Sequence, residues 1–525
     1  MSASILINGK WAPSAGSERF QAVNPATDET LPDEFPVSPL PEVEEAVEAA
    51  AAAFAATRGW PGERFAAFLE KYADLIDGRA DSIVAAANLE TALPVEPRLK
   101  SVELPRTTNQ LRQAAAAARD GSWALPTSDP QSGIRSIYGP IGPVAVFGPN
   151  NFPLAFNSIA GGDFAAAVAA GNPVIAKGHS SHPETTRLFA EAAHEAAEGT
   201  EMPAGFVQLI YRTSHADGAK LVSHPKLGAT GYTGSRSAGL VLKRAADEAG
   251  KPIYLELSSI NPVYMLPGVL EERCDELANE FATSCLMGAG QFCTNPGVVI
   301  LRAGPTSDKF VAAVAEQFAQ APAGTLLSRG VERGFREGIA ALREAGAEVV
   351  TGDAPADENR CCYANTLLRT TGAAFLANPE GLQAEAFGNS SLFVLADNDE
   401  EVVAITEALE GNLTGCIYSH SGGEDDALYD RIAPVLREKV GRLLNDKMPT
   451  GVAVSPAMNH GGPFPATGHP GFTAVGIPAS LRRFAMLQCY DNVRAHRLPQ
   501  ALQDKSPHPG MWRCIDGDCR QGDVG

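Results

Sequence analysis

Short apolar runs alternate with longer amphipathic stretches through the middle of the chain. Runs rich in Val, Ile and Leu are typical of buried strands, and stretches with apolar residues at helical spacing are typical of helices. The pattern predicts strands at 141–148, 173–178, 205–211, 228–234 and 252–258, and helices at 158–171, 183–198, 215–224 and 235–249. Regular alternation of strand and helix with short connections predicts a parallel sheet covered by helices on both faces.

Further elements are expected on both sides of this region. Ala-rich helical patterns occupy 40–56, 61–90 and 102–119. A second alternating region contains helical patterns at 271–287, 306–320 and 399–410, and strand patterns at 296–303, 391–396 and 415–420. The Gly- and Pro-rich run 449–480 is expected to be a long structured loop, and residues 501–525 a loosely ordered tail.

Polar residues follow several of the predicted strands directly. The loop PNNFP (149–153) follows the first strand, Lys177 ends the second, and GYTGS (231–235) covers the end of a later one. Ligands of open α/β sheets bind at the carboxyl ends of the strands. We therefore expect these polar groups to converge at one edge of the sheet.

Composition narrows the class of protein. A length of 525 residues is enough for about three domains. The net charge of −20 argues against nucleic acid or an anionic membrane as a partner. The nine cysteines form neither a disulfide framework nor a pattern with zinc spacing, so we expect no metal site and a reducing cytoplasm. Neither a signal peptide nor an apolar run of membrane-spanning length is recognisable.

One cysteine stands in an unusual setting. Cys293 lies in GAGQFCTNPG (288–297), a loop of Gly, Gln, Thr, Asn and Pro that follows a helical pattern. Buried structural thiols normally have apolar neighbours, whereas a loop with free backbone donors suits a thiolate nucleophile. A lone cysteine in a polar loop is equally often inert, so partners elsewhere in the chain decide between the two.

Each candidate partner has two interpretations when it is taken alone. Asn151 could donate to an oxyanion or simply form a turn, and Glu256 could be a general base or half of a salt bridge. Lys177 could contact a ribose or phosphate, or extend to the surface, and Glu385 could bind a ribose diol or solvent. The segment GYTGSRSAG (231–239) fits a phosphate at a helix start or a plain strand-to-helix junction.

In this order and context, however, the motifs resemble the aldehyde dehydrogenase superfamily. The likeness rests on PNNFP, AKG, TGSRSAG, LELSSINP, GQFC and EAFG, and extends from LINGKW to about residue 497. It implies an α/β fold with a Rossmann-type dinucleotide-binding domain (1–121 and 141–257) and an α/β catalytic domain (258–448). It also implies a small β oligomerisation element (122–140 and 482–497), a structured loop region (449–481) and a C-terminal tail (498–525).

The resemblance assigns roles to these side chains. Cys293 is expected to attack an aldehyde and form a thioester, Asn151 and the Cys293 N–H to form the oxyanion hole, and Glu256 to activate water. Cofactor-binding positions implied by the family are Lys177, Glu385, Phe387, Gly234, Ser235 and Gly239. The family also implies a homodimer or homotetramer.

Two departures from the common family pattern bear on the cofactor. Ser258 and Ser259 replace the glycines of the usual LELGGK motif, and Ser180 stands where a glutamate often binds the adenosine ribose. Loss of that carboxylate removes a repulsion against a 2′-phosphate. We therefore expect NADP to be accepted, with Lys177, Ser180 and Arg212 around the phosphate, while NAD remains possible.

The substrate is suggested by a narrower resemblance. GPNNFPLAFNS, AKGHSSHP, GQFCTNPG and NHGGPFPAT resemble bacterial α-ketoglutaric semialdehyde (2,5-dioxovalerate) dehydrogenases and NADP-linked fatty-aldehyde dehydrogenases, and residues 471–494 fit the former better. This implies oxidation of 2,5-dioxopentanoate to 2-oxoglutarate in sugar acid catabolism. Arg106 is either the cation for the distal carboxylate or a solvated helix residue.

Three other functions remain open at this point. The enzyme could oxidise fatty or other aliphatic aldehydes instead. A non-catalytic structural relative would be expected to lack the nucleophile, base or oxyanion donor, and none is missing here. A coenzyme A-dependent acylating enzyme would not need the water-activating Glu256.

Overall fold

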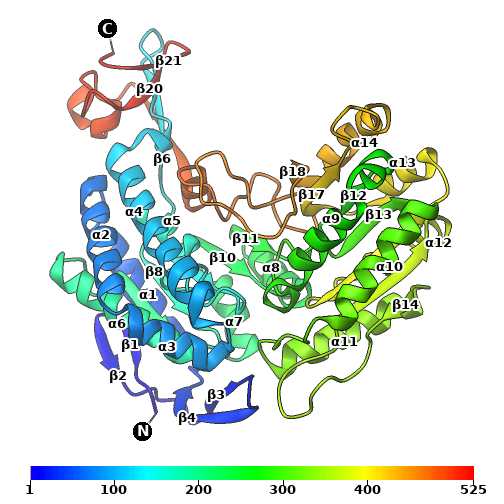
Figure 1. The fold of residues 1–525 in the computed structure, drawn as a ribbon. Coiled ribbons are helices and arrows are strands. Elements are labelled where there is room, and N and C mark those ends of the chain that lie inside the picture. The colour runs from blue at the N-terminus through cyan, green and yellow to red at the C-terminus, as the bar shows by residue number, and fades with distance from the viewer. Residues whose placement is uncertain (1, 525) are drawn as a thin grey trace.

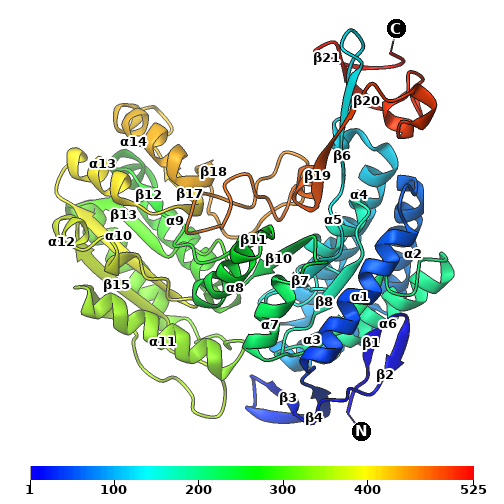
Figure 2. The same ribbon diagram turned by 180° about the vertical axis from the view of Figure 1, so that it is seen from behind.

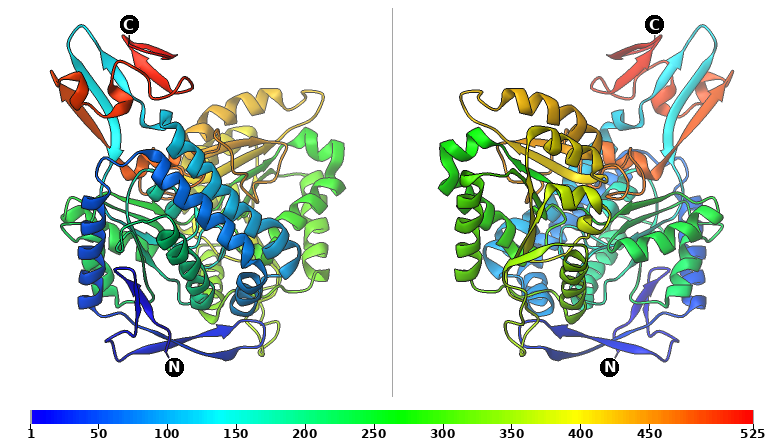
Figure 3. Two further views of the ribbon diagram at one scale, coloured as in Figure 1. Left: turned by 90° about the vertical axis from the view of Figure 1, so that its left-hand side faces the viewer. Right: turned by 90° about the vertical axis from the view of Figure 1, so that its right-hand side faces the viewer.

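The computed structural model describes residues 2–524 and is organised around three large sheets. Two seven-stranded sheets, each flanked by helices, lie side by side (Figure 1). A five-stranded sheet projects from the body on one side (Figure 3). A short hairpin of β3 (Arg19–Asn24) and β4 (Glu29–Pro36) lies near the N-terminus.

The first seven-stranded sheet confirms the predicted parallel arrangement. Its order is β11 (Ile253–Glu256), β10 (Ala229–Thr233), β7 (Val144–Phe147), β8 (Val174–Lys177), β9 (Val207–Ile210), β1 (Ile5–Ile7) and β2 (Lys10–Ala12). The first five strands are parallel, and β1 and β2 extend the sheet antiparallel. The strand order changes direction at β7, which is the usual position of a ligand crevice in such sheets.

Helices cover this sheet because their Ala-rich faces pack closely. They are α1 (Leu40–Ala56), α2 (Gly62–Gly78), α3 (Ala80–Thr91), α4 (Leu104–Asp120), α5 (Gly162–Ala169), α6 (Pro183–Gly199), α7 (His215–Val222) and α8 (Arg236–Glu248). A π-helical segment, Val95–Glu103, leads into α4. Ser235 caps α8 by accepting a hydrogen bond from Ala238 N at 3.4 Å.

The second seven-stranded sheet carries helices on both of its faces. Its order is β14 (Glu348–Thr351), β15 (Thr366–Thr371), β16 (Ser390–Ala396), β13 (Val298–Arg302), β12 (Val263–Met265), β17 (Asn412–Tyr418) and β18 (Val440–Asn445). Only β14 is antiparallel to its neighbour. The helices are α9 (Pro267–Leu286), α10 (Pro305–Gln320), α11 (Arg329–Glu344), α12 (Gly372–Ala377), α13 (Asp399–Ala408) and α14 (Asp426–Lys439).

Strand β13 illustrates why the second region folds as a three-layer unit. Val298 and Ile300 belong to one buried apolar cluster, whereas Val299 and Leu301 belong to another. Successive side chains of a strand point to opposite faces of the sheet. A continuous apolar run therefore fills two cores at once, as expected for a strand covered on both sides.

The five-stranded sheet corrects the expectation of a loose C-terminal tail. Its order is β19 (Ala485–Asp491), β6 (Ile134–Pro140), β5 (Thr127–Asp129), β20 (Trp512–Ile515) and β21 (Asp518–Gln521). Strand β20 pairs parallel with β5, and the Arg513 side chain is buried and donates to three backbone carbonyls. Pairing with a distant strand orders this segment, and local sequence does not reveal such pairing.

Two predicted helices differ in extent. The expected helix 61–90 is broken at Arg79, whose φ of −109° and ψ of 14° depart from α-helical values, so that α2 and α3 are separate. The expected helix 158–171 begins only at Gly162. Gly161 approaches the backbone of Phe156 too closely for a side chain, because a Cβ there would lie 2.6 Å from Phe156 Cα. The chain is therefore still turning at that point.

A long segment without helix or strand, 446–478, connects β18 to the five-stranded sheet and lies between the two larger units (Figures 1 and 2). It hydrogen-bonds to the end of β11: Leu257 N donates to Ala466 O at 2.8 Å, and Gly468 N donates to Leu255 O at 3.0 Å. Among residues 2–524, no helix is long and apolar enough to cross a membrane.

Candidate active site

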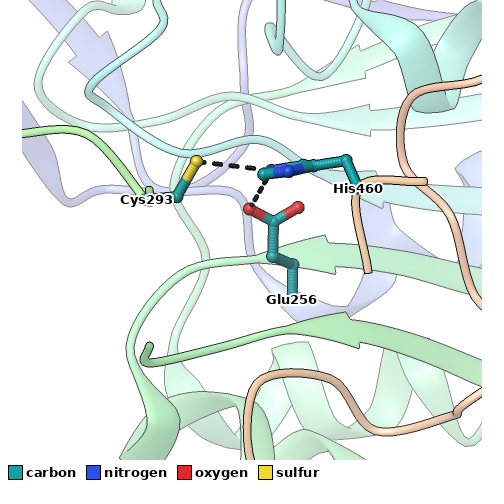
Figure 4. Close-up of side chains that lie close together, drawn as sticks. All are labelled: Glu256, Cys293 and His460. Carbon is teal, nitrogen blue, oxygen red and sulfur yellow. Dashed lines mark hydrogen bonds and ion pairs between the residues drawn. The ribbon is translucent and has the colours of Figure 1, made fainter. Parts of the chain in front are cut away.

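Three side chains from distant parts of the sequence meet at the end of β11 (Figure 4). Cys293 Sγ lies 3.3 Å from His460 Nε2, and the same nitrogen lies 2.8 Å from Glu256 Oε1. His460 and Glu256 are buried, whereas Cys293 is partly exposed. A thiol, an imidazole and a carboxylate in direct contact are the components of a nucleophile activated by a base.

The loop that carries Cys293 depends on glycine. Gly288, Ala289 and Gly290 all have positive φ, between 56° and 68°, which turns the chain sharply after α9. A Cβ on Gly290 would lie 2.0 Å from the carbonyl oxygen of Gly388. The loop can therefore lie directly against the segment that contains Glu385 only because position 290 has no side chain.

Asn151 lies beside the same loop, as its position after β7 suggests. Its Nδ2 donates to Gln291 O at 3.1 Å, two residues before Cys293. The Asn151 backbone is held by Arg98, whose guanidinium donates to Asn151 O at 3.0 Å. Glu103 fixes the rest of the loop by accepting from Leu154 N at 2.8 Å and Ala155 N at 2.9 Å. The amide is thus rigidly positioned next to the nucleophile loop.

The charge on His460 follows from its two neighbours. Burial alone would lower its pKa, but the negative charges of Glu256 and Cys293 and the hydrogen bonds to both outweigh burial. The pKa of His460 is therefore raised well above its usual range. A protonated imidazole at this place holds a positive charge 3.3 Å from the sulfur that would act as the nucleophile.

Arg106 lies on α4 and forms no salt bridge within residues 2–524. In that part of the chain its buried Nε and Nη2 atoms also have no hydrogen-bond partner. Its guanidinium carbon lies 5.6 Å from the ring centre of Phe152 and 5.3 Å from that of Phe156. Burial lowers the pKa of Arg106, and the charges of Glu103 and Cys293 counteract this. Arg98, in contrast, is ion-paired with Glu103.

Three phenylalanines form the apolar wall near these cations. Phe152, Phe156 and Phe292 pack together in one small cluster with Ala155. The ring centres of Phe152 and Phe292 are 5.5 Å apart, edge to face. Phe292 directly precedes Cys293, so the wall begins at the nucleophile.

Two further cations stand at the carboxyl ends of β8 and β9. Burial, and to a smaller extent the nearby positive charge of Arg212, together lower the pKa of Lys177 to about 8. Within residues 2–524, neither side chain forms a salt bridge, and Ser180 follows in the same turn. Unpaired cations at strand ends fit an anionic ligand such as a nucleotide phosphate.

At the junction between β10 and α8, two glycines allow the backbone to lie close to neighbouring side chains. A Cβ on Gly234 would lie 2.7 Å from Tyr232 Oη, and one on Gly239 would lie 2.5 Å from Leu257 Cδ2. Ser235 caps the helix with its side chain. The glycines therefore serve strand–helix packing, and the helix start remains suited to a phosphate.

Glu385 and Phe387 line a small cavity behind the nucleophile loop, together with Gly290 and Phe292. Glu385 Oε1 accepts from Ser259 N at 3.3 Å. Burial raises the pKa of Glu385 to about 7, against hydrogen bonds from Ser258 and Ser259 that lower it. A carboxylate held here could accept hydrogen bonds from a ribose.

The sequence alone did not point to His460 or Arg98. His460 lies in the long loop and is held by its own backbone, which donates to Thr473 Oγ1 at 3.1 Å. Among residues 2–524, Glu256, Cys293 and His460 are the one group found whose ligand atoms could hold a metal ion, all lying within 4.8 Å of one another. These donor types also suit zinc.

Sequence comparison gives two consistent results. The model of the aldehyde dehydrogenase family matches residues 11–453. α-Ketoglutaric semialdehyde dehydrogenase 2 of Azospirillum brasilense is 41% identical over 514 residues, covering 96% of this chain and 97% of that protein. α-Ketoglutaric semialdehyde dehydrogenase of Acinetobacter baylyi is 35% identical, covering 96% of each.

Comparison of structures agrees at the level of the fold. Lactaldehyde dehydrogenase from Escherichia coli superimposes with a TM-score of 0.80, although the identity is only 22%. The match covers 93% of this chain and 98% of that chain. The overall arrangement of the chain therefore belongs to a known fold.

Proposed function

The chain belongs to the aldehyde dehydrogenase family, and we propose that its substrate is 2,5-dioxopentanoate (α-ketoglutaric semialdehyde), which it oxidises to 2-oxoglutarate. The enzyme is an NAD(P)-dependent aldehyde dehydrogenase. The contact of one imidazole nitrogen with both the Cys293 sulfur and the Glu256 carboxylate is the observation that carries the proposed mechanism.

The reaction begins at Cys293. Its thiolate sulfur bonds to the aldehyde carbon, and the carbonyl oxygen takes up the negative charge. Asn151 Nδ2, held beside the loop by its bond to Gln291 O, has a second N–H with which to stabilise that oxygen, together with the backbone N–H of Cys293. When bound, the nicotinamide supplies the acceptor for the hydride that leaves this carbon. The product on the enzyme is a thioester.

Hydrolysis of the thioester is assigned to Glu256. The carboxylate removes a proton from water as the water oxygen bonds to the thioester carbon, and the sulfur then leaves as thiolate. His460 stabilises that leaving thiolate, because its protonated imidazole lies 3.3 Å from the sulfur. His460 thus connects the two half-reactions, since the same nitrogen contacts the group that attacks and the group that activates water.

The acidic end of the substrate is assigned to Arg106. Its two buried, unpartnered nitrogens are an unfavourable arrangement unless an anion completes it. The three carbons between the aldehyde and the carboxylate of the substrate would run along Phe152 and Phe156. Arg98 is already neutralised by Glu103 and is not available for this role.

Oxidation of an aliphatic aldehyde is the second candidate. The cluster of Phe152, Phe156 and Phe292 favours it, because an apolar wall suits a hydrocarbon chain. A non-catalytic relative is not supported, because sulfur, carboxylate and amide are all in position. Transfer of the acyl group to coenzyme A is not supported either, because that reaction would not need Glu256 as a base that activates water.

NADP is the proposed cofactor, with NAD as an alternative. The 2′-phosphate would be surrounded by Lys177, Ser180 and Arg212, and the pyrophosphate by Gly234, Ser235 and Gly239. Glu385 and Phe387 would contact the second ribose and the nicotinamide ring attached to it. The absence of a carboxylate partner for Lys177 and Arg212 within residues 2–524 supports this assignment. The positive charges of these two side chains are therefore available to the doubly charged 2′-phosphate.

Assembly and setting are part of the same proposal. Strand β19 is an edge strand with Met486 and Leu487 exposed, which supports a homodimer or homotetramer built on the five-stranded sheet. The nine free cysteines support a cytoplasmic location. A role in sugar acid catabolism is proposed together with the substrate, which is the one that the names of the two relatives give. The proposed domains keep the boundaries expected from the sequence. They are the dinucleotide-binding domain (1–121 and 141–257), the catalytic domain (258–448), the oligomerisation element (122–140 and 482–497), the loop region (449–481) and the C-terminal segment (498–525).

A substrate panel tests the proposal. Purified enzyme is assayed with 2,5-dioxopentanoate, succinic semialdehyde and aliphatic aldehydes, each with NADP and with NAD, by reduced-cofactor absorbance. We expect kcat/KM for 2,5-dioxopentanoate to exceed that of an uncharged aldehyde of equal length about tenfold or more, the worth of one charge-assisted hydrogen bond. Preference for the uncharged aldehyde would support the second candidate instead.

A further inference from the structure

Two cysteines face each other across the C-terminal hairpin. In the antiparallel pairing of β20 and β21, Cys514 stands directly opposite Cys519. The strands are joined by a two-residue turn, Asp516 and Gly517, with φ of 53° and 86°. Positive φ at both positions defines a type I′ turn, which matches the natural twist of a hairpin. The register of the two thiols is thus fixed by the turn between them.

Backbone hydrogen bonds show which kind of cross-strand pair this is. Cys514 N donates to Pro126 O at 2.9 Å, and Asp516 N donates to Ser128 O at 3.1 Å. The Cys514 amide therefore points toward β5 and away from Cys519. Directly opposite residues that do not exchange backbone hydrogen bonds have Cα atoms about 4.5 Å apart, with their side chains close together. Disulfides accept Cα separations of about 4.4–6.8 Å.

The remaining cysteines lack this arrangement. Five are buried: Cys274, Cys285, Cys361, Cys362 and Cys416. Cys489 is exposed on β19, but it stands opposite Ser136. Cys519 is exposed and Cys514 partly so, and the hairpin lies on the sheet that projects from the body (Figure 3). It is thus the one exposed place among the described residues where two thiols face each other in a strand pair.

We propose that Cys514 and Cys519 are a modification site that forms a reversible intramolecular disulfide with a peroxide or a low-molecular-weight disulfide as oxidant. With hydrogen peroxide, the Cys519 thiolate attacks one peroxide oxygen, the O–O bond breaks, and Cys519 becomes a sulfenic acid. The hydroxide that leaves takes up the proton lost by the Cys519 thiol and becomes water. The Cys514 thiolate then attacks that sulfur and expels hydroxide, which takes up the remaining proton. Two thiols are oxidised, and one peroxide is reduced to two waters.

Glutathione disulfide gives the same product by exchange. The Cys519 thiolate forms a mixed disulfide and releases one glutathione, and Cys514 then displaces the second. The order follows from exposure, because Cys519 is the more accessible thiol and Cys514 the nearby resolving one. Burial raises the pKa of Cys514, which is consistent with its acting second.

The bridge would close a small ring within the hairpin and fasten it next to β5. Strand β20 contacts β5 through only two paired positions, Cys514 with Thr127 and Ile515 with Ser128. A bond at Cys514 therefore acts at the point where the hairpin joins the sheet. The bond between Cys514 and Cys519 does not itself involve Cys293, which lies in the loop between α9 and β13.

Peptide mass spectrometry tests the proposal on the full-length protein. Trypsin releases Cys514–Arg520, CIDGDCR, as one peptide that contains both thiols. The native protein is incubated with glutathione disulfide, remaining thiols are blocked with iodoacetamide, and the digest is analysed without reduction. We expect CIDGDCR to be lighter by two hydrogens and free of alkyl groups, and to accept two alkyl groups after reduction. Cys489, which has no facing thiol, serves as the internal control and should carry glutathione.

A variant separates the disulfide from general thiol reactivity. In Cys519→Ser, we expect Cys514 to end as a free thiol or a glutathione adduct, with unchanged aldehyde oxidation and thermal unfolding. Recovery of wild-type CIDGDCR with two alkyl groups, or with two separate glutathione adducts, in a sample whose Cys489 is fully modified would overturn the proposal. The outcome is independent of the enzyme's substrate and cofactor, so it does not depend on the proposed function.

Discussion

His460 and Glu256 form a buried ion pair, with Nε2 and Oε1 2.8 Å apart and side chains only 1% and 2% exposed. The pair joins the long loop to the end of β11, and Cys293 completes it through the same nitrogen. A charge that is buried with its partner is costly to leave alone. Removal of either residue should therefore affect the chemistry of the other, and of the thiol.

His460→Gln should slow alkylation of Cys293. The variant removes the imidazole that lies 3.3 Å from the Cys293 sulfur, and kcat should fall by about 10²–10⁴-fold. The measurement is the rate of iodoacetamide inactivation as a function of pH, without cofactor. His469→Gln changes an exposed histidine of the same loop and should leave the profile unchanged. An unaltered alkylation rate in His460→Gln would contradict the proposed activation.

Glu256→Gln should uncouple the two half-reactions. Thioester hydrolysis needs the carboxylate, so turnover should fall by about 10²–10⁴-fold, while a first burst of reduced cofactor persists. The burst should be slower than in the wild type, because loss of the Glu256 charge also lowers the pKa of His460. Stopped-flow absorbance measures the burst, and intact-protein mass spectrometry detects the acyl adduct. Loss of the burst with full retention of hydrolysis would reverse the assignment.

Arg106→Ala should change specificity more than rate. The carboxylate of an acidic semialdehyde loses its cation, so kcat/KM for that substrate should fall by about 10–100-fold, mainly through KM. Uncharged aldehydes should be affected little. Arg112→Ala is the matched control, because Arg112 lies on the same helix and is paired with Asp74 and Asp77. Equal losses for charged and uncharged substrates would remove Arg106 from the binding site.

Lys177 should make cofactor preference depend on pH. Its pKa is lowered to about 8, so the side chain is charged below that pH and becomes neutral above it. Attraction to a 2′-phosphate is therefore present at neutral pH and lost as the pH rises through 8. KM for NADP should increase in that range more than KM for NAD. In Lys177→Met the ratio of the two should be flat, and a flat ratio in the wild type would exclude this role.

Gly290→Ala should destabilise the protein and impair catalysis together. Its Cβ would meet Gly388 O at 2.0 Å, and backbone atoms cannot move aside as a flexible side chain can. Overpacking of this kind costs about 1–3 kcal/mol, in addition to strain at positive φ. Gly250→Ala isolates the strain, because Gly250 has nearly the same φ, 67°, and no atom within 4 Å. Thermal unfolding compares the two, and equal shifts would exclude the clash.

Local sequence was informative where chemistry follows a strand. Lys177 and Glu256 end strands of the first sheet, and Asn151 follows another, so their convergence could be predicted from the alternation of elements. The rest depends on contacts between distant segments. His460 reaches Glu256 because loop residues pair with β11 through Leu257 and Gly468, and no periodicity predicts that pairing. Arg98 positions Asn151 by donating to its backbone carbonyl. Every residue has such a carbonyl, so the residue types do not reveal this contact.

The C-terminal hairpin shows the same limit. Asp516–Gly517 is a strong turn signal, yet it says nothing about which strand the hairpin will join. That choice is made by β5, nearly four hundred residues earlier. Burial of Arg513 could not be predicted from the sequence either, because its hydrogen-bond partners are backbone carbonyls, which every residue has.

Helix α4 and the π-helical segment before it connect selection of the substrate to support of the oxyanion donor. Arg106 lies one turn beyond Glu103, and Glu103 with Arg98 fastens the Asn151 loop. Anyone who redesigns this enzyme for a new aldehyde will therefore meet epistasis at α4. Replacements in α4 that are chosen to fit a new substrate will also shift the support of Asn151 and so lower turnover. Compensating substitutions in residues 98–103 should therefore be tested in combination with them.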